Sequence, residues 1–330
     1  MNTPVVFLVF NRPDLTRRVF ERIRQARPPK LLVVCDGPRV ARPEDQDKVA
    51  AVQRIIAEGV DWPCEVITNY SERNLGCRER VASGITWAFS LVEEAIILED
   101  DCLPDVSFFT FCDQMLERFR GDDRVMHING TNFITSHLKP RTSYFFSKYV
   151  WVWGWATWRR AWQHYDYSMS TWNLRFHSLN STFDSRRERA YWLSTFETAR
   201  RDWQAAATWD FSWIYSCWAH GALTVMPSLN LVENLGFGPG ATHTTRDAPH
   251  LRIPAVNLSV ARHPIHVRRS RVRDDMMFRA YSGLRLDWRS DLAGTLRVLH
   301  RQLCGLGAET LTGDSQRPSV QLMSKDDLVV

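Results

Sequence analysis

The chain has 330 residues, 44% of them hydrophobic, which is enough to bury the core of one large α/β domain or of two smaller ones. The formal net charge of +5 is modest, and no signature of a nucleic-acid-binding module accompanies it. No stretch of about 18 to 20 uncharged apolar residues is present, and the N-terminus lacks the basic region of a signal peptide. The seven cysteines are scattered without a CxxC pair, which indicates reduced thiols. We therefore expect a soluble, cytoplasmic protein.

The first hundred residues alternate short apolar runs with amphipathic stretches. This pattern predicts strands over 5–10, 31–35, 64–68 and 95–98, and helices over 14–25, 44–58 and 78–92. Strands that alternate with helices in this way form a parallel sheet covered on both faces. Such sheets bind ligands outside the carboxyl ends of their strands.

Polar residues follow three of these predicted strands. Asn11 and Arg12 follow the first strand, Asp36 follows the second, and Glu99-Asp100-Asp101 follows the fourth. No GxGxxG or GxxxxGK[ST] signature is present, which disfavours a dinucleotide-binding enzyme and a P-loop NTPase. Any phosphate groups must then be held by side-chain charge and by metal.

The tripeptide Glu99-Asp100-Asp101 places three carboxylates together at the end of an apolar run. Adjacent carboxylates repel one another and cannot be buried unpaired, so we expect a positive partner there. A hard divalent cation such as Mg²⁺ or Mn²⁺ accepts carboxylate oxygens and takes phosphate and water as its other ligands. The alternative is an acidic turn that fixes arginine side chains. If the partner is a cation, the tripeptide predicts a metal-dependent enzyme that acts on a phosphorylated or nucleotide-linked substrate.

The second half predicts helices over 108–119, 193–204, 211–220 and 287–303 and strands over 125–130 and 223–226. Tryptophans at alternate positions and then at helical spacing predict a strand that turns into a helix near Gly154, and they serve either as core or as sugar platforms. Segment 235–243 is rich in glycine and suits a mobile loop. Arginines concentrate in 262–289, either as a solvated face or as a patch that attracts anionic lipid.

Six short pieces carry a resemblance to a known family: 9–13 (VFNRP), 35–37 (CDG), 74–77 (NLGC), 98–101 (LEDD), 209–210 (WD) and 237–243 (FGPGATH). In this order they resemble the nucleotide-diphospho-sugar transferases of the GT-A fold. Among these, the chain is most similar to the branch around the animal N-acetylglucosaminyltransferase I and its bacterial family 2-like relatives. The resemblance implies an α/β fold with a mainly parallel, Rossmann-like sheet flanked by helices and a C-terminal acceptor-side portion.

The resemblance also implies roles for residues at the donor end of the site. Arg12 would approach the nucleotide, and Asp36 would accept a hydrogen bond from the base, unless it is only a turn residue. Glu99 would lie near the nucleoside, Asp100 near the donor sugar and Asp101 on the metal. Strand alternation supports this division, because it places Glu99 and Asp101 on one side and Asp100 on the other.

At the acceptor end, the resemblance places Asp210 as the general base of an inverting transfer, with Glu233 as the competing carboxylate. Asp210 is otherwise an ordinary first-turn helix residue. Phe237 and Gly238 would begin a loop that closes over the bound donor, and His243 is a further candidate metal ligand.

We therefore predict one GT-A domain, with residues 1–130 as the nucleotide-sugar-binding half, 131–306 as the acceptor and catalytic half, and 307–330 as a flexible tail. The predicted activity is Mn²⁺- or Mg²⁺-dependent, inverting transfer of a sugar, a hexose or an N-acetylhexosamine, from a UDP-sugar to a glycan or lipid-linked acceptor. Contact with the inner face of the membrane would use the basic segment 262–289. The alternatives are a sugar-phosphate nucleotidyltransferase and a non-catalytic glycan-binding protein.

Overall fold

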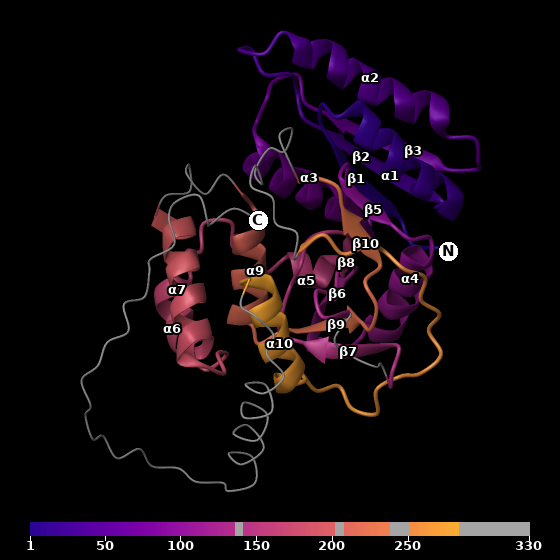
Figure 1. Ribbon diagram of the computed structural model, residues 1–330. Coiled ribbons are helices and arrows are strands. Elements are labelled where there is room, and N and C mark those ends of the chain that lie inside the picture. The colour runs from indigo at the N-terminus through magenta and orange to yellow at the C-terminus, as the bar shows by residue number, and fades with distance from the viewer. Residues whose placement is uncertain (136–140, 202–207, 238–250, 284–330) are drawn as a thin grey trace, which may run out of the picture.

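The computed structural model describes residues 1–135, 141–201, 208–237 and 251–283 (Figure 1). Four of the predicted features lie outside these residues: Gly238, His243, the helix over 287–303 and the tail over 307–330. None of the helices in the described ranges combines the length and the apolar character that crossing a membrane requires.

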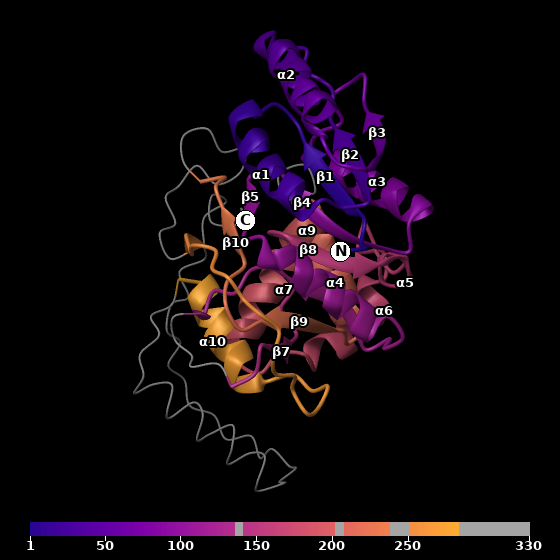
Figure 2. The same ribbon diagram turned by 90° about the vertical axis from the view of Figure 1, so that its right-hand side faces the viewer.

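The first half of the chain forms the predicted alternation of strands and helices. Its elements are β1 (Val5–Val9), α1 (Pro13–Ala26), β2 (Lys30–Cys35), α2 (Glu44–Gly59), β3 (Glu65–Tyr70), α3 (Cys77–Leu91) and β4 (Glu94–Glu99). The four strands are parallel and lie in the order β3-β2-β1-β4. The helices α1 and α2 pack side by side on one face, and α3 packs on the other (Figure 2). Right-handed crossovers require this arrangement, because the chain passes from β1 toward β3 in one direction and returns to β4 in the other.

The second half extends the same sheet and adds a short antiparallel pair of strands beside it. Its elements are β5 (Cys102–Pro104), α4 (Ser107–Phe119), β6 (Val125–Asn129), β7 (Tyr144–Ser147), β8 (Trp155–Trp158), α5 (Arg159–Trp162), α6 (Trp172–Asn180), α7 (Arg186–Arg201), α9 (Asp210–Ala219), β9 (Leu223–Pro227), β10 (Val232–Asn234) and α10 (Arg271–Tyr281). The complete eight-stranded sheet has the order β3-β2-β1-β4-β8-β6-β9-β7, and β5 pairs with β10. This mixed sheet with helices on both faces confirms the predicted α/β class.

Strand β8 joins the two halves of the sheet, pairing antiparallel with β4 on one side and with β6 on the other. Its tryptophans, Trp155 and Trp158, pack against helices on opposite faces of the sheet. Residues three positions apart in a strand point to opposite faces. Trp155 contacts the ring of Trp213 in α9 at 5.8 Å, whereas the Trp158 indole N–H donates to the Leu116 carbonyl in α4 at 3.3 Å. These side chains are buried, so for them the core interpretation is correct.

The strand predicted over the alternating tryptophans before Gly154 is wrong, because residues 148–154 have no regular secondary structure and the strand begins only at Trp155. Side chains of β6 hold this segment in place of a strand ladder. The Asn129 amide N–H donates to the Tyr149 carbonyl at 2.9 Å, and the ring Nε2 of His127 lies 3.0 Å from the Trp151 carbonyl. All residues of 149–155 are buried, so the alternation of aromatic residues in the sequence does not mark a strand with one buried face.

Some arginines of the basic segment 262–289 make contacts within the protein. Arg269 pairs with Asp184 at 2.6 Å, and the Arg273 guanidinium stacks over the Phe145 ring at 4.4 Å. Charges that are satisfied internally contribute little to a surface field. The exposed cations of this segment include Arg262 and Arg268.

Candidate functional site

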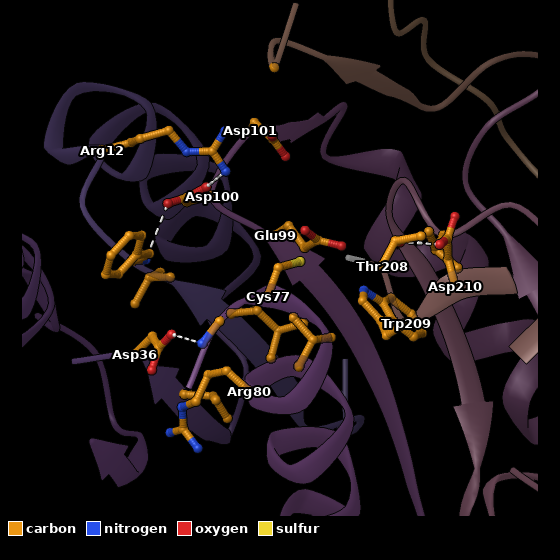
Figure 3. Close-up of a pocket in the computed structure, with 18 of the residues that line it drawn as sticks. Arg12, Asp36, Cys77, Arg80, Glu99, Asp100, Asp101, Thr208, Trp209 and Asp210 are labelled. Carbon is orange, nitrogen blue, oxygen red and sulfur yellow. Dashed lines mark hydrogen bonds and ion pairs between the residues drawn. The ribbon is translucent and has the colours of Figure 1, made fainter. Parts of the chain in front are cut away.

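A pocket of about 250 Å³ opens at the carboxyl ends of β1, β2 and β4. Strand order reverses between β1 and β4, and open α/β sheets bind ligands in the crevice at such a switch point. The start of α9 and the segment after β10 close its opposite side (Figure 3). Among its lining residues are Phe10, Arg12, Asp36, Asn74, Gly76, Cys77, Arg80, Glu99, Asp100, Asp101, Trp153, Thr208, Trp209, Asp210 and Gly236.

Arg12 is the positive partner of two of the three adjacent carboxylates. Its guanidinium donates one hydrogen bond to Asp100 Oδ1 and another, of 2.8 Å, to Asp101 Oδ2. The Asp100 carboxylate also accepts a bond from the Phe10 backbone N–H at 3.3 Å, so it fastens the end of β1 to the end of β4. Asp100 and Asp101 thus form the acidic turn that fixes an arginine, which was the alternative to a bound cation.

The expected alternation of sides along the tripeptide, with Glu99 and Asp101 on one side and Asp100 on the other, is wrong. Asp100 and Asp101 share one arginine, whereas the Glu99 carboxylate points across the pocket toward Thr208 and Asp210 (Figure 3). The reason is that β4 ends at Glu99, so the two-residue period of a strand does not continue into the turn that follows.

Glu99 and Asp210 form the second acidic feature of the pocket. Burial, with the charge of Asp101 as the second cause, raises the pKa of Glu99 to about 8. Burial likewise raises the pKa of Asp210 to about 6, although its hydrogen bond from the Thr208 hydroxyl opposes the shift. Carboxyl groups with raised pKa values in a cleft are typical of proton-transfer sites.

Asp210 is the first residue of α9 and is only 3% exposed. The preceding Trp209 is also buried and stacks on Trp155 with ring centroids 5.7 Å apart, which fixes the start of the helix. Glu233 lies on β10 opposite Leu103 of β5 and is not among the described residues that line the pocket. Of the two candidate bases, the geometry favours Asp210.

Asp36 lies at the pocket wall, but both oxygens of its carboxylate already accept hydrogen bonds from neighbouring residues. One oxygen accepts the backbone N–H groups of Gly37 and Leu75, each at 2.9 Å. The other accepts the Gly76 N–H and the Asn74 side-chain N–H, each at 3.0 Å. Four donors use all the lone-pair sites that two carboxylate oxygens offer. Two separate sequence motifs, Asp36-Gly37 and 74–77, are therefore one clasp at the base of the pocket.

The segment after β10 lies directly against Asp101. The Leu235 N–H donates to the Asp101 backbone carbonyl at 2.8 Å, and a Cβ at Gly236 would lie 2.3 Å from Asp101 Oδ2. Only glycine fits that close approach. Phe237 then packs edge-on against Trp153 with ring centroids 5.6 Å apart. Trp153 is itself held by the Thr131 hydroxyl, which donates to its carbonyl at 2.8 Å.

Sequence reasoning missed several residues of the pocket. Arg80 of α3 donates to the Cys35 carbonyl at 3.1 Å and to the Asn69 carbonyl, so it ties together the ends of β2 and β3. Arg39 lies over the Phe10 ring at 5.3 Å and pairs with the fully buried Asp45 at 2.6 Å. The helical position of Arg80, facing the sheet, was a usable signal, whereas nothing in the loop around Arg39 marks it.

The carboxylates of the pocket fit a divalent cation only if a substrate phosphate supplies further ligands. Mg²⁺ is commonly held by one or two carboxylates plus phosphate oxygens. The Asp101 side chain suits this mode because it is 15% exposed at the pocket, whereas Asp100 is 2% exposed. Within the described ranges, no group of three or more His, Cys, Asp or Glu side chains could hold an ion alone.

The sequence matches no protein-family model and no curated protein. Two solved structures of the galactosyltransferase LgtC, an active-site mutant and a complex with donor and acceptor sugar analogs, are each 12% identical, with TM-scores of 0.32 and 0.31. Each match covers 52% of this chain and 64% of LgtC. UDP-glucose pyrophosphorylase bound to UDP-glucose is 10% identical, with a TM-score of 0.24, over 44% of this chain and 62% of that one. Scores this low carry no functional argument, so the proposals below rest on the residues of the pocket.

Proposed function

We propose that the protein is a glycosyltransferase that moves a sugar from a nucleotide-diphosphate donor, most simply a UDP-sugar, to a glycan or lipid-linked acceptor hydroxyl. The observation that supports this proposal is that the two ends of one pocket carry different chemical groups. Its Arg12 side offers a guanidinium next to a partly exposed carboxylate, and its α9 side offers Asp210, a buried carboxyl group with a raised pKa.

The donor end is the side formed by Arg12 and Asp101. A guanidinium matches the geometry of a phosphate oxygen pair, and it stays charged at every relevant pH. Asp101 would hold Mn²⁺ or Mg²⁺ against the diphosphate, where the ion stabilises negative charge on the leaving group. The family resemblance, in which the last carboxylate of the tripeptide holds the metal, supports the same assignment.

The acceptor end is the side formed by Asp210 and Glu99. Asp210 as a carboxylate accepts the proton of the acceptor hydroxyl, whose oxygen attacks the anomeric carbon of the donor sugar. The bond from that carbon to the diphosphate oxygen breaks, and the nucleoside diphosphate leaves with the electron pair. Attack from the face opposite the leaving group inverts the anomeric centre. A pKa of about 6 keeps Asp210 ionised at neutral pH while leaving it basic enough to take the proton.

A binding screen tests the donor class. UDP-, GDP-, CMP- and dTDP-sugars are titrated calorimetrically with and without Mn²⁺, and we expect a UDP-sugar to bind with Mn²⁺ dependence. Asp101→Asn should lose the Mn²⁺-dependent part of that affinity. If no nucleotide sugar binds under either condition, the proposal is wrong.

Matched variants test the base. Asp210→Asn should bind the donor normally and lose roughly two to four decades of turnover, the usual contribution of a positioned general base. Glu233→Gln is the control, and it should keep near-parental turnover because Glu233 lies outside the pocket lining. The reverse result would move the base to Glu233. Turnover is followed as sugar transfer to glycan acceptors and as donor hydrolysis, with product configuration read by NMR.

The setting of the reaction follows from the acceptor class. A lipid-linked glycan would bring the enzyme to the cytoplasmic face of a membrane, and the exposed Arg262 and Arg268 would contribute to contact with anionic headgroups. Because the neighbouring Arg269 and Arg273 are bound internally, we expect this contact to be weak and sensitive to salt.

A further inference from the structure

We propose that Arg12 is the resident counter-ion of Asp101 in the donor-free protein, and that a divalent cation must displace it from that carboxylate. The ion would then enter together with the donor diphosphate and bind poorly before it. This inference rests on the proposed function only in taking a nucleoside diphosphate as the ligand of the pocket. It makes Arg12 a residue that sets the order of binding, beyond a contact for the nucleotide.

One carboxylate oxygen of Asp101 is crowded by its neighbours. Asp101 Oδ2 accepts the 2.8 Å hydrogen bond from Arg12 Nη1, and the same oxygen lies where a Cβ on Gly236 would approach to 2.3 Å. The guanidinium and the chain at Gly236 thus both lie close to Oδ2. An ion that binds this oxygen must take the place of the guanidinium, because backbone atoms cannot move aside as easily as a side chain.

Neighbouring residues hold Asp101 in this position. Its backbone carbonyl accepts the Leu235 N–H at 2.8 Å, and its other carboxylate oxygen accepts the Cys102 thiol at 3.6 Å. The carboxylate is therefore presented at a fixed place between Arg12 and the segment after β10. Competition for Asp101 must be resolved by movement of Arg12.

Arg12, by contrast, has room to move. Its side chain is 22% exposed, whereas its second partner Asp100 is 2% exposed and fixed by the Phe10 N–H. Arg12 can keep Asp100 as a tether while the Nη1 group leaves Asp101. A donor diphosphate at the pocket offers oxygens that accept this group and others that complete the coordination of an ion. Diphosphate and cation should then favour each other, and the coupling must be reciprocal.

The test compares two variants that differ only at Arg12. Arg12→Met alone leaves the buried Asp100 without its ion-pair partner, which threatens folding. We therefore pair Arg12→Met with Asp100→Asn, and use Asp100→Asn alone as the matched control, since it keeps Arg12 on Asp101. Mn²⁺ affinity without nucleotide is measured from the electron paramagnetic resonance signal of free Mn²⁺, and circular dichroism checks that both variants are folded.

We expect the double variant to bind Mn²⁺ alone at least tenfold more tightly than Asp100→Asn. Equal affinities would overturn the proposal. The unmodified protein gives a second test that depends on no variant: UDP should raise its Mn²⁺ affinity at least tenfold, and equal Mn²⁺ affinity with and without UDP would also overturn the proposal. Neither measurement uses sugar transfer, so failure here is distinguishable from failure of the proposed activity, which the turnover of Asp210→Asn and Glu233→Gln decides separately.

Discussion

Asp36→Asn is the substitution that best separates a structural role from nucleotide recognition at the base of the pocket. The Asp36 carboxylate accepts four hydrogen bonds, from the N–H groups of Gly37, Leu75, Gly76 and Asn74. An amide keeps one acceptor oxygen, but its NH₂ group faces two donors and can accept from neither. Two hydrogen bonds to a charged acceptor, each contributing about 1.5 to 3 kcal/mol, are lost. Because water from the pocket replaces part of that loss, we expect stability to fall by about 2 to 4 kcal/mol.

The measurement is urea denaturation followed by circular dichroism, with the slope on denaturant checked to be unchanged. The control is Asp47→Asn, the same chemical change at an exposed position of α2, which should alter stability by no more than about 0.5 kcal/mol. UDP affinity is measured on the same samples.

The two roles of Asp36 predict different results. If the carboxylate anchors the loop at 74–76, stability falls and UDP affinity falls with it, because Asn74 and Gly76 line the pocket. If the carboxylate reads the base, UDP affinity falls while the free energy of unfolding stays at the parental value. That second result would refute the reasoning from hydrogen-bond donors.

Three further predictions follow from the pocket. With a pKa of about 6, Asp210 loses its carboxylate form as pH falls, so kcat/KM for the UDP-sugar should drop about tenfold per unit below pH 6; a profile that stays flat to pH 5 would contradict the base assignment. Burial raises the pKa of Glu99 to about 8 in the folded protein, so its contribution to stability is complete below its ordinary pKa and is lost as pH rises through about 8. Glu99→Gln should therefore flatten the fall of Tm between about pH 5 and pH 9, and an unchanged slope would count against the shift. Gly236→Ala should cost about 1 to 3 kcal/mol and weaken UDP binding, since its Cβ meets Asp101 at 2.3 Å, while Gly121→Ala, with open space around it, should be nearly neutral in both assays.

The first half of the fold could be predicted because its signals are local. Each buried parallel strand is a short continuous apolar run, as in Val5–Val9, and each helix carries its own periodicity. Polar residues at three strand ends then predicted the side of the sheet on which the pocket lies. The antiparallel insertion of β8 between β4 and β6 could not be predicted, because pairing of Ile96 with Ala156 depends on contacts far apart in the sequence.

The sequence predicted which residues line the site better than it predicted which residues they bond to. Arg12, the tripeptide and Asp210 all line the pocket, but the sequence did not identify Arg12 as the arginine that pairs with the tripeptide. The Arg12 pairs reach across 88 and 89 residues of chain, and Asp36 is held by backbone N–H groups 39 and 40 residues away. Backbone donors leave no trace in residue type, so no sequence pattern identifies them. Stronger signals came from Gly37 and Gly76, whose places in the clasp need glycine: a Cβ at Gly37 would lie 2.5 Å from the Arg73 backbone, and Gly76 has a φ of +79°.

The charge of the pocket is divided unequally, and this division gives the substrate its orientation. At one end Arg12 compensates the charge of Asp101, so an incoming diphosphate meets a cation that is already in place. At the other end the charge of Asp210 adds to the cost of ionising Glu99, and the described residues offer Glu99 no ion pair at 4 Å or less. A diphosphate placed there would face two carboxyl groups and would raise both pKa values further, whereas a neutral sugar hydroxyl carries no such penalty. Phosphate is therefore expected at the β1 end and the reacting hydroxyl at the α9 end, and a donor bound in the opposite sense would leave Asp210 without a proton to accept.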